Sequence, residues 1–476
     1  MNPQPVVLTE HLFYYHRCAR RSFLDYRQGV IPQPERSRHR EQVCSRWPGP
    51  SPQYQPPAWD QGFHATLALM RQGVPAIHQG VLQVVTPAAV LVGRPDILIR
   101  EAGSSRWGAW HYRPLEIRLG QRLKPEYQAV AAFHSWLLAQ IQGVWPRWGE
   151  LALPGPRFLR VNLEQALPPM HQMLAACLNT LKQPEAPEVF ISRSRCQLCP
   201  WLDYCSTVAK QKHHLSLVPG VTLKRYAELQ TLGLNRIDDL AQADPQLIYH
   251  RTSLGVNTSN KLVRQAQAIA QQKALAVAPI SRLPQASVGY FFDIEADPYL
   301  DCVYLHGVLL VTPHAQQFYS LVAEQINQEG HIWQQLLTLL ERYPQAPIYH
   351  FCPFEPQTIQ RLGHKYGTSP ARIQAIRHRC VDLHARLVRS VVLPVENYTL
   401  KAIGRWLGFG WQHPGADGAQ CTQWYNQWLQ THDRSYLQAL QQYNRDDCYA
   451  TYHLYRWLVD FMRQQQAAPA VLPSTG

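Results

Sequence analysis

Residues 288–295, VGYFFDIE, constrain the fold of this chain more than any other stretch. The segment is apolar and aromatic until it reaches Asp293 and Glu295, a pattern typical of a buried strand that ends in acids. Successive side chains of a strand point to opposite faces of the sheet, so these two carboxylates, two residues apart, project the same way. One divalent ion could therefore contact both.

A second acidic element lies about 150 residues downstream, in SYLQALQQYNRDDCYATYHLYRWLVDF. Its apolar residues recur at helical spacing, and on that helix Tyr443 and Asp447, four residues apart, share a face. Asp446 points off this face, and we interpret it as a bystander. Strand-end acids and helix-surface acids are each common alone, but their occurrence together in this order predicts one active site.

The two motifs together resemble those of the DEDDy exonucleases, which have a ribonuclease H-like fold. The segments FFDIEADP, YHFCPFEPQTIQRL, NYTLKAIGRWLGFGW and YNRDDCYATYHLY resemble more closely the YprB-type ribonuclease H-like domain that occurs fused to RecB-like nucleases. The resemblance implies that Asp293, Glu295 and Asp447 bind catalytic Mg²⁺ or Mn²⁺ and that Tyr443 orients the attacking water. It also implies 3′ to 5′ exonucleolytic cleavage of DNA or RNA.

The middle acid of this site departs from the family pattern. DEDD enzymes usually place an Asp there, whereas this sequence offers Glu355 in YHFCPFEPQ and Asp382 in CVDLHARL. We favour Glu355, because it follows the strand-like APIYHF and begins the helix EPQTIQRL. Its longer side chain can still reach a metal ion.

Three cysteines, Cys196, Cys199 and Cys205, form a C-x2-C-x5-C array, and Cys18 could supply a fourth thiolate. In a long intracellular chain such a cluster points to a metal or cofactor rather than to disulfides. Zinc and an iron–sulfur cluster both suit four cysteines. The array resembles that of the iron–sulfur RecB-like nucleases, which implies a [4Fe–4S] cluster joining the two ends of the domain, with zinc as the alternative.

Between these cysteines, GRPDILIR and LEIRLG resemble the PD-(D/E)xK core of restriction-endonuclease-like nucleases. The resemblance assigns Asp96 and Glu116 as metal ligands. The lysine of that core is Arg118 here, which keeps the positive charge but effectively never loses its proton. Catalysis at this site is therefore one hypothesis, and a nucleic-acid-binding or structural remnant is the other.

Two further features of this core stay open. The downstream Gln-x-x-x-Tyr of the family is incomplete, since Gln128 is followed by Ala132 at the Tyr position. His64 and His78 lie upstream, where such enzymes can carry another metal-binding residue.

The middle of the chain, VPGVTLKRYAELQTLGL, resembles a helix-hairpin-helix module, in which a Gly-containing turn presents backbone N–H groups to a phosphate. Thr222 replaces the usual second turn glycine, so a plain two-helix connector is the alternative. The residues expected to contact backbone phosphate are Gly220, Val221, Lys224 and Arg225.

Charge and patterning set the wider expectations. A formal net charge of +13, with 14 Trp and 21 His, suits a polyanion such as nucleic acid. The first residues lack the basic flank and apolar core of a secretory signal, and no stretch approaches membrane-spanning length. We therefore predict a soluble, cytoplasmic protein with a nucleic-acid partner and no membrane partner; no pattern identifies a protein partner.

The predicted fold is an α/β multidomain chain, since 476 residues exceed what one core usually holds. We expect a PD-(D/E)xK domain over 1–210, a helix-hairpin-helix-like domain over 211–278, a ribonuclease H-like mixed sheet with flanking helices over 288–465, and a disordered tail over 466–476. Residues 32–58, rich in Pro, Ser and Arg, indicate an exposed insertion. The predicted function is a metal-dependent nuclease; the alternative is a nucleic-acid-binding or scaffold protein with decayed nuclease centres.

Overall fold

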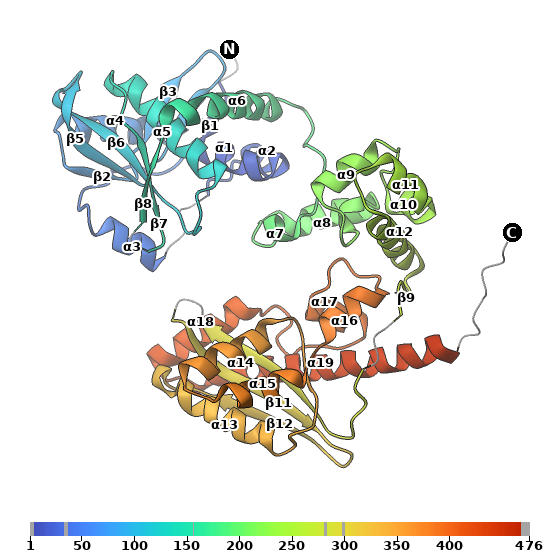
Figure 1. Cartoon of the computed structure of the whole chain (residues 1–476). Coiled ribbons are helices and arrows are strands. Elements are labelled where there is room, and N and C mark those ends of the chain that lie inside the picture. The colour runs from blue at the N-terminus through green and yellow to red at the C-terminus, as the bar shows by residue number, and fades with distance from the viewer. Residues whose placement is uncertain (1–3, 33–36, 156, 280–282, 298–299, 468–476) are drawn as a thin grey trace. The chain divides into compact units, whose positions relative to one another are not determined.

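The computed structural model of the chain describes residues 4–32, 37–155, 157–279, 283–297 and 300–467. Most of the predicted tail, 468–476, lies outside the described residues. The chain forms two compact units (Figure 1). The first unit comprises Met1–Val189 and Ser194–Cys205, and the second comprises Phe190–Arg193 and Ser206–Gly476. The finer division of the second unit into two domains stays a prediction.

Two sheets form the frame of the first unit. The larger has the order β2-β5-β6-β7-β8, in which β6 and β7 are parallel and the other neighbours antiparallel. Its strands are β2 (Ala76–His78), β5 (Ile97–Ser105), β6 (Gly108–Ile117), β7 (Gly149–Leu153) and β8 (Arg157–Val161). The smaller sheet contains β1 (Val6–Leu8), β4 (Val90–Gly93) and β3 (Leu82–Val85), in that order.

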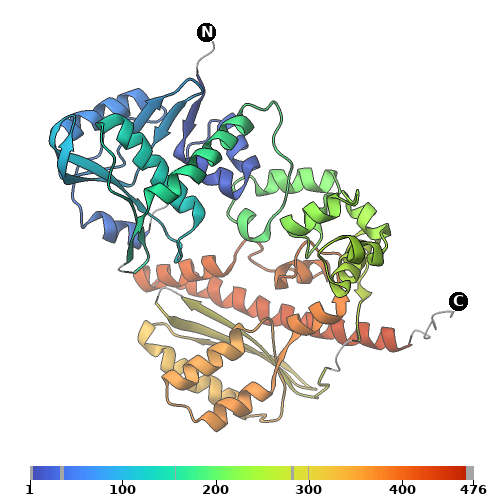
Figure 2. The same cartoon turned by 45° about the horizontal axis from the view of Figure 1, so that its top comes forward.

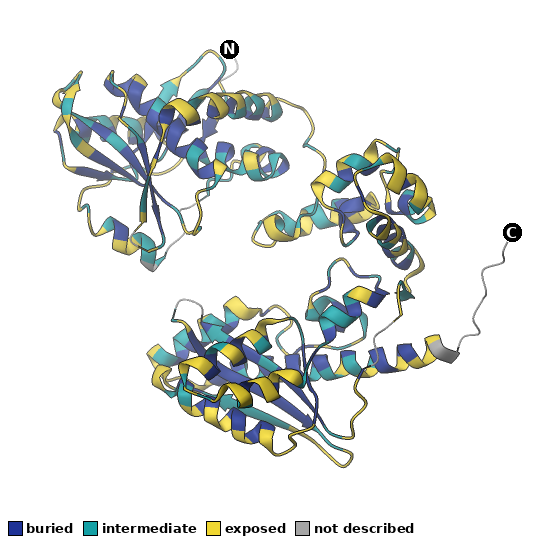
Figure 3. Ribbon diagram, in the orientation of Figure 1, coloured by how far each residue is buried: buried dark blue, intermediate teal, exposed yellow. Residues whose placement is uncertain are grey.

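Helix α5 (Pro125–Gln142) joins the parallel pair β6 and β7 and lies in the core of the first unit. Proline in its first turn and Gly143 at its C-cap, with a φ of 76°, set its two ends. Most of its side chains are buried (Figure 3). The other helices of this unit are α1 (Thr9–Arg17), α2 (Ala19–Arg27), α3 (Arg38–Cys44), α4 (Trp59–Arg71) and α6 (Leu163–Leu181), together with α7 (Arg193–Cys196) from its second residue onward.

Most of the described residues in the segment 32–58 are exposed, as expected of an insertion at the surface. Its described part contains the helix α3, and Val43 on that helix is 4% exposed and packs with Ala76 and Ile97. Val43 and the partly buried Cys44 thus anchor this helix against the sheet, which the sequence did not predict.

The second unit begins with a group of short helices. They are α8 (Leu202–Gln211), which crosses the boundary between the units, α9 (Leu223–Gln230), α10 (Ile237–Gln242), α11 (Pro245–Arg251) and α12 (Val256–Gln271). The turn before α9 contains Gly220 at a φ of 97°, a backbone conformation that favours glycine. Thr222 stands where a second glycine was expected because its hydroxyl accepts from Arg225 N and caps α9.

The residues predicted to contact phosphate at this turn are only partly available. Val221 is 8% exposed, and its N–H donates to the carbonyl oxygen of Val218 at 3.1 Å. Gly220, Lys224 and Arg225 are at the surface, although the Arg225 guanidinium donates to Gly220 O at 2.7 Å. The turn has the expected shape, and phosphate binding there stays a prediction.

A five-stranded mixed sheet forms the centre of the second unit. Its order is β12-β11-β10-β13-β14, with antiparallel pairing on the β11 side of β10 and parallel pairing on the β13 side. Its strands are β10 (Gly289–Asp297), β11 (Cys302–Val311), β12 (Gln316–Val322), β13 (Ile348–His350) and β14 (Cys380–Asp382). A mixed sheet with flanking helices is the architecture predicted for this region.

The alternation of side chains along β10 decides what each face of the sheet meets. Phe292 and its even-numbered neighbours pack in a core with Trp333 of α13 (Glu329–Glu341). Phe291 packs in another core with Leu454 of α19 (Arg434–Ala467), the long red helix that runs along the sheet in Figures 1 and 2. Residues 293 and 295 share the parity of Phe291 and therefore face α19.

The remaining helices complete the two layers. Helices α14 (Phe354–Lys365) and α15 (Pro370–His378) join the core on the α13 face. Helices α16 (Leu383–Ser390), α17 (Leu400–Trp406) and α18 (Gly418–Thr431) contact α19. Among the described residues, no helix has both the length and the apolar character needed to cross a membrane.

One buried histidine in β11 makes the fold sensitive to acid. His306 is fully buried against Phe292, at a ring-centroid distance of 5.9 Å, and neither ring nitrogen has a hydrogen-bond partner among the described residues. Burial lowers its pKa to about 3. Because the unfolded chain binds this proton near pH 6.5, folding stability falls as pH drops below that value.

We expect His306→Leu to remove this acid sensitivity. Between about pH 7 and pH 5, the unfolding free energy of the wild type should fall by about 2 kcal/mol more than that of the variant. Urea unfolding followed by circular dichroism at the two pH values measures the difference. His314→Leu, which changes an exposed histidine, is the control; equal pH dependence in the wild type and in His306→Leu contradicts the assignment.

Candidate active site

The acids predicted from the two motifs meet on one face of the C-terminal sheet. Asp293 and Glu295 extend from the central strand β10, and Asp447 extends toward them from α19. One carboxylate oxygen of each lies within 4.8 Å of the others. We call these three residues the acid triad. Among the described residues, no other group of three or more His, Cys, Asp or Glu side chains is gathered as closely.

The triad carries concentrated negative charge. Burial, followed by the charge of Asp447, raises the pKa of Asp293 and of Glu295 well above their usual values. Burial likewise raises the pKa of Asp447 to about 6. Carboxylates in this state are stabilised by a cation, and Mg²⁺ and Mn²⁺ prefer oxygen ligands. The donor atoms and their charge therefore fit a divalent ion.

Tyr443 lies against the triad as the helical spacing predicts. It is 6% exposed, and the interaction of its hydroxyl with Asp447 partly offsets the rise in the pKa of that acid. Burial and the charge of Asp447 raise the pKa of the Tyr443 phenol. Its hydroxyl therefore keeps its proton at neutral pH and is available as a hydrogen-bond donor.

The two candidates for the fourth acid have different surroundings. Glu355, in the first turn of α14, is 3% exposed, and its charge raises the pKa of both Asp293 and Glu295. Asp382 caps α16 by accepting from Ala385 N at 2.9 Å. The geometry thus favours Glu355, although its carboxylate lies outside the close group of three. Its role as a metal ligand stays a prediction.

His350 lies beside Glu355 and would form an ion pair with it if its imidazole were protonated. His350 Nδ1 lies 3.4 Å from Glu355 Oε2, but its shorter contact, 2.6 Å, is with the carbonyl oxygen of Cys352. The Glu355 carboxylate is therefore only weakly held within the protein, and burial raises its pKa.

Asn444 is a site residue that the motif analysis missed. It is fully buried, and its Nδ2 donates to Asp293 Oδ2 at 2.6 Å. Gly307 of β11 pairs opposite Asp293, and a Cβ at position 307 would overlap the Asn444 amide. Two features of the sequence could have indicated Asn444. It is an amide next to Tyr443, and the predicted strand contains Gly307, since a glycine inside a strand often marks the close approach of another group.

Two further neighbours hold Asp447 in place. Trp411 Nε1 donates to Asp447 Oδ1 at 2.7 Å, and Asp446 accepts from Gln412 N at 2.8 Å. Asp446, expected to be a bystander, thus does not join the triad and instead holds the segment that carries Trp411.

Lys401 of α17 is a cation whose charge acts on the triad, and the sequence motifs did not indicate it. Its charge lowers the pKa of Glu295 and of Asp447. Its ammonium donates to the carbonyl oxygen of Ala416 and lies 4.6 Å from the ring centre of Tyr443. The lysine is thus held beside the acids without neutralising all of them.

Residues 290–459 match the family model RNase_H_2, described as RNase_H superfamily. This part of the chain is a ribonuclease H-like domain. The matched range contains the acid triad, Glu355 and Tyr443. None of the curated proteins matches the chain.

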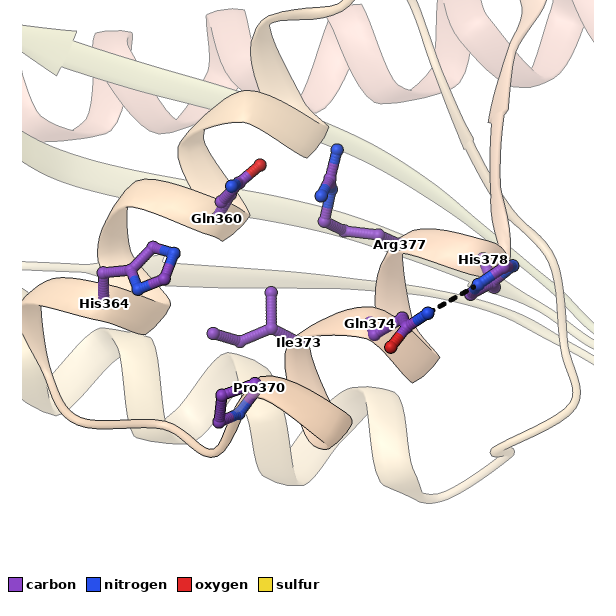
Figure 4. A pocket seen from close by; sticks show the side chains of 7 residues that line it. All are labelled: Gln360, His364, Pro370, Ile373, Gln374, Arg377 and His378. Atoms are coloured by element: carbon purple, nitrogen blue, oxygen red, sulfur yellow. Dashed lines mark hydrogen bonds between the residues drawn. The ribbon is translucent and has the colours of Figure 1, made fainter.

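The ribonuclease H-like domain also has a groove between α14 and α15, with a volume of about 440 Å³ (Figure 4). Gln374 Nε2 lies 3.4 Å from His378 Nε2 at one end of it. Its lining side chains include no carboxylate, so the groove does not offer a metal ion the kind of ligand that the triad offers. They are Gln360, His364, Pro370, Ile373, Gln374, Arg377 and His378.

In the first unit, Asp96, Glu116 and Arg118 line one cavity of about 270 Å³. Asp96 immediately precedes β5, Glu116 lies near the end of β6, and Ile117 N donates to Asp96 Oδ2 at 2.6 Å. The strands thus bring together the three residues that the PD-(D/E)xK resemblance selects. We call this cavity the N-terminal pocket.

Cations already contact both acids of the N-terminal pocket. Arg40 Nη1 lies 2.5 Å from Asp96 Oδ1, and Arg118 Nη2 lies 2.8 Å from Glu116 Oε2. Burial acts to raise the pKa of Asp96, but the charges of Arg118 and Arg40 hold it below its usual value. In this arrangement the residues present do not fit a divalent metal ion.

Other residues weighed for this pocket lie elsewhere. His64, His78 and Gln128 are not among its lining residues, and His78 Nε2 contacts the carbonyl oxygen of Trp47 at 2.6 Å. Helix α5 contributes His134 instead, whose Nδ1 bonds to Glu116 Oε1.

The predicted cluster cysteines lie in two segments of the first unit that contact each other. Trp201 Nε1 donates to Asp25 Oδ1 at 2.7 Å, and Arg195 donates to the carbonyl oxygen of Arg17 at 2.9 Å. Burial raises the pKa of the Cys205 thiol. Arg20 acts to lower this pKa, and the charges of Cys18 and Cys199 act to raise it.

The spacing of these sulfur atoms is wider than a closed zinc site requires. Four thiolates at about 2.3 Å from one zinc lie within about 4 Å of one another. No three of the described cysteines lie within 4.8 Å of one another. The described arrangement is therefore not a closed tetrahedral site.

We expect Asn444→Ala to weaken Mn²⁺ binding by roughly 10- to 100-fold, because the variant removes the donor that orients Asp293. Titration of Mn²⁺ followed by electron paramagnetic resonance measures the affinity. Gln441→Ala is the control, since Gln441 lies on the same helix and donates to Ser320 Oγ instead. Equal Mn²⁺ affinity in Asn444→Ala and the wild type would contradict this role.

Proposed function

We propose that the protein is a metal-dependent nuclease that hydrolyses phosphodiester bonds of DNA or RNA in its ribonuclease H-like domain. The observation that carries this proposal is the acid triad, which lies within the range matched to the RNase H superfamily. The net charge of +13 supports a polyanionic substrate.

Each residue of the site has a separate task in this proposal. Asp293, Glu295 and Asp447 hold the cation, with Glu355 as a fourth carboxylate. When bound, Mg²⁺ or Mn²⁺ supplies Lewis acidity and lowers the pKa of water. Tyr443 keeps its proton and orients the attacking water through its hydroxyl.

The neighbours of the triad keep this arrangement in place before substrate binds. Asn444 and Trp411 donate to Asp293 and Asp447 and so limit the orientations of those carboxylates. Lys401 places a positive charge beside the triad, which favours the approach of a phosphate.

The polarity of cleavage is the finer part of the proposal. The DEDDy resemblance, in which Tyr443 precedes Asp447 by one helical turn, supports removal of nucleotides from a 3′ end. Substrates labelled at either end distinguish this polarity from internal cleavage.

Asp293→Asn should lower Mn²⁺-dependent cleavage of labelled single-stranded DNA or RNA by more than about 100-fold, because the triad loses a charged ligand. The measurement is the rate of product release at fixed Mn²⁺ by protein with an unchanged circular dichroism spectrum. Asp460→Asn, which changes an exposed acid on the same helix as Asp447, should retain wild-type cleavage.

The outcomes of this assay separate the two candidate centres. Retained cleavage in Asp293→Asn rules out the triad as the active site. Loss in Glu116→Gln with full activity in Asp293→Asn instead moves catalysis to the N-terminal pocket.

A second candidate function is nucleic-acid binding without hydrolysis. The observations that favour it are the arginines against the acids of the N-terminal pocket and the glutamate at position 355. In that case the turn at Gly220, with Lys224 and Arg225, contributes contacts to phosphate. Tight binding that weakens steeply with salt, without cleavage of any DNA or RNA substrate, supports this function.

We also propose that the first unit is a RecB-like domain that holds a [4Fe–4S] cluster through Cys18, Cys196, Cys199 and Cys205. Support comes from the sequence array and from the contacts between the segments that carry it. Zinc is the alternative, and it requires the sulfur atoms to move closer together than the described arrangement has them.

Cys196→Ser should lose the bound iron, because one thiolate ligand is removed. Protein purified without oxygen is assayed for iron, acid-labile sulfide and zinc. Cys44→Ser, a change in the same unit outside the predicted set, should keep the wild-type iron content. Zinc without iron in the wild type selects the alternative, and absence of both contradicts a metal centre.

A further inference from the structure

The N-terminal pocket and the acid triad present carboxylates in opposite electrostatic states. In the triad, burial and neighbouring acids raise the pKa of each member. In the N-terminal pocket, two guanidinium groups hold the pKa of Asp96 below its usual value. Both sites consist of Asp and Glu side chains. Their pKa values shift in opposite directions because the protein supplies two arginines to the acids of the N-terminal pocket.

Every carboxylate oxygen of Asp96 and Glu116 already has a protein partner. Asp96 Oδ1 meets Arg40 at 2.5 Å, and its Oδ2 accepts from Ile117 N at 2.6 Å. Glu116 Oε2 accepts from Arg118 at 2.8 Å, and its Oε1 bonds to His134. A metal ion would have to displace these contacts.

Arg118 is placed between the two acids. Its Nη2 meets Glu116, and its Nη1 lies 3.4 Å from Asp96 Oδ2. The side chains of Arg118 and Arg40 are 19% and 18% exposed, whereas those of Asp96 and Glu116 are 6% and 1% exposed. The arginine side chains are therefore more exposed than the acids that they contact.

The charges of Asp96, Glu116, Arg40 and Arg118, which we call the cluster, balance one another. Two guanidinium groups face two carboxylates, and arginine keeps its charge at every physiological pH. A divalent ion would add two positive charges beside two permanent ones. Removing an arginine, in turn, would leave a carboxylate that is buried and uncompensated.

The same cluster connects separate elements of the first unit. Arg40 comes from α3, Asp96 and Glu116 from the ends of neighbouring strands, and His134 from α5. His134 Nε2 in turn contacts Thr9 Oγ1 of α1 at 2.7 Å. Hydrogen bonds and ion pairs thus join the segment 32–58 to the buried helix and the sheet.

We propose that the N-terminal pocket binds no divalent metal ion, because Arg118 and Arg40 occupy the positions of cations around Asp96 and Glu116, and that the cluster is a structural clamp of the first unit. The proposal concerns the first unit alone and does not rest on the proposed nuclease function. A guanidinium cannot lower the pKa of water as a metal ion does, so this pocket hydrolyses no phosphodiester.

The test uses the full chain with the triad disabled by Asp293→Asn and Asp447→Asn together. Binding of Mn²⁺ is followed by electron paramagnetic resonance of the free ion. The variant should bind no Mn²⁺ in the concentration range in which the wild type binds it. One Mn²⁺ per chain that persists in this variant, and is lost when Glu116→Gln is added, would overturn the proposal.

This design also separates the two proposals. If the wild type binds no Mn²⁺ and cleaves nothing, the nuclease proposal fails while the metal-free pocket stands. If the disabled variant retains an ion that depends on Glu116, the metal-free pocket fails whatever the source of the cleavage activity.

Thermal unfolding gives an independent readout of the clamp. Glu116→Gln should lower the Tm by roughly 6 °C, because a charged member of a buried cluster is lost. A structural clamp predicts the same decrease with and without Mn²⁺. A decrease seen only in the presence of Mn²⁺ would show that Glu116 acts through a bound metal and would overturn the proposal.

Discussion

The close approach of three largely buried carboxylates is the constraint that the rest of the ribonuclease H-like domain must satisfy. Asp293, Glu295 and Asp447 are held together although burial and like charge oppose their ionisation. Such a cluster destabilises the metal-free fold and persists only because the surrounding core holds it. The same concentration of charge favours a divalent cation, so the cost to folding and the fit to a metal ion have one origin.

The long helix α19 both packs in the core and carries residues of the acidic site. Its apolar residues, among them Leu454 and Leu458, pack into the core against the sheet, and this burial holds the helix in position. The same helix carries Asn444 and Asp447, so the packing that stabilises the domain also sets the distance between acids from distant parts of the chain. Gly307 allows the close approach, because any side chain there would displace Asn444.

Comparison of the two acidic sites shows that residue type alone does not specify chemistry. Asp96 and Glu116 lie at the adjoining ends of β5 and β6, whereas Asp293 and Glu295 lie within β10. The protein supplies guanidinium groups to the first pair, whereas the second pair has a third carboxylate and one lysine nearby. The balance of charge around the two pairs therefore differs, and this difference is the basis on which we propose a metal ion at one of them and none at the other.

The sequence by itself determined the features that depend on local periodicity. A strand repeat of two placed Asp293 and Glu295 on one face, and a helical turn aligned Tyr443 with Asp447; both patterns follow from backbone geometry over a few residues. The packing of Val43 of α3 against the sheet and the contact of Asn444 with Asp293 were decided only by tertiary structure. These contacts join segments far apart in the chain, 151 residues for Asn444 and Asp293, and only packing of the whole domain brings such segments together.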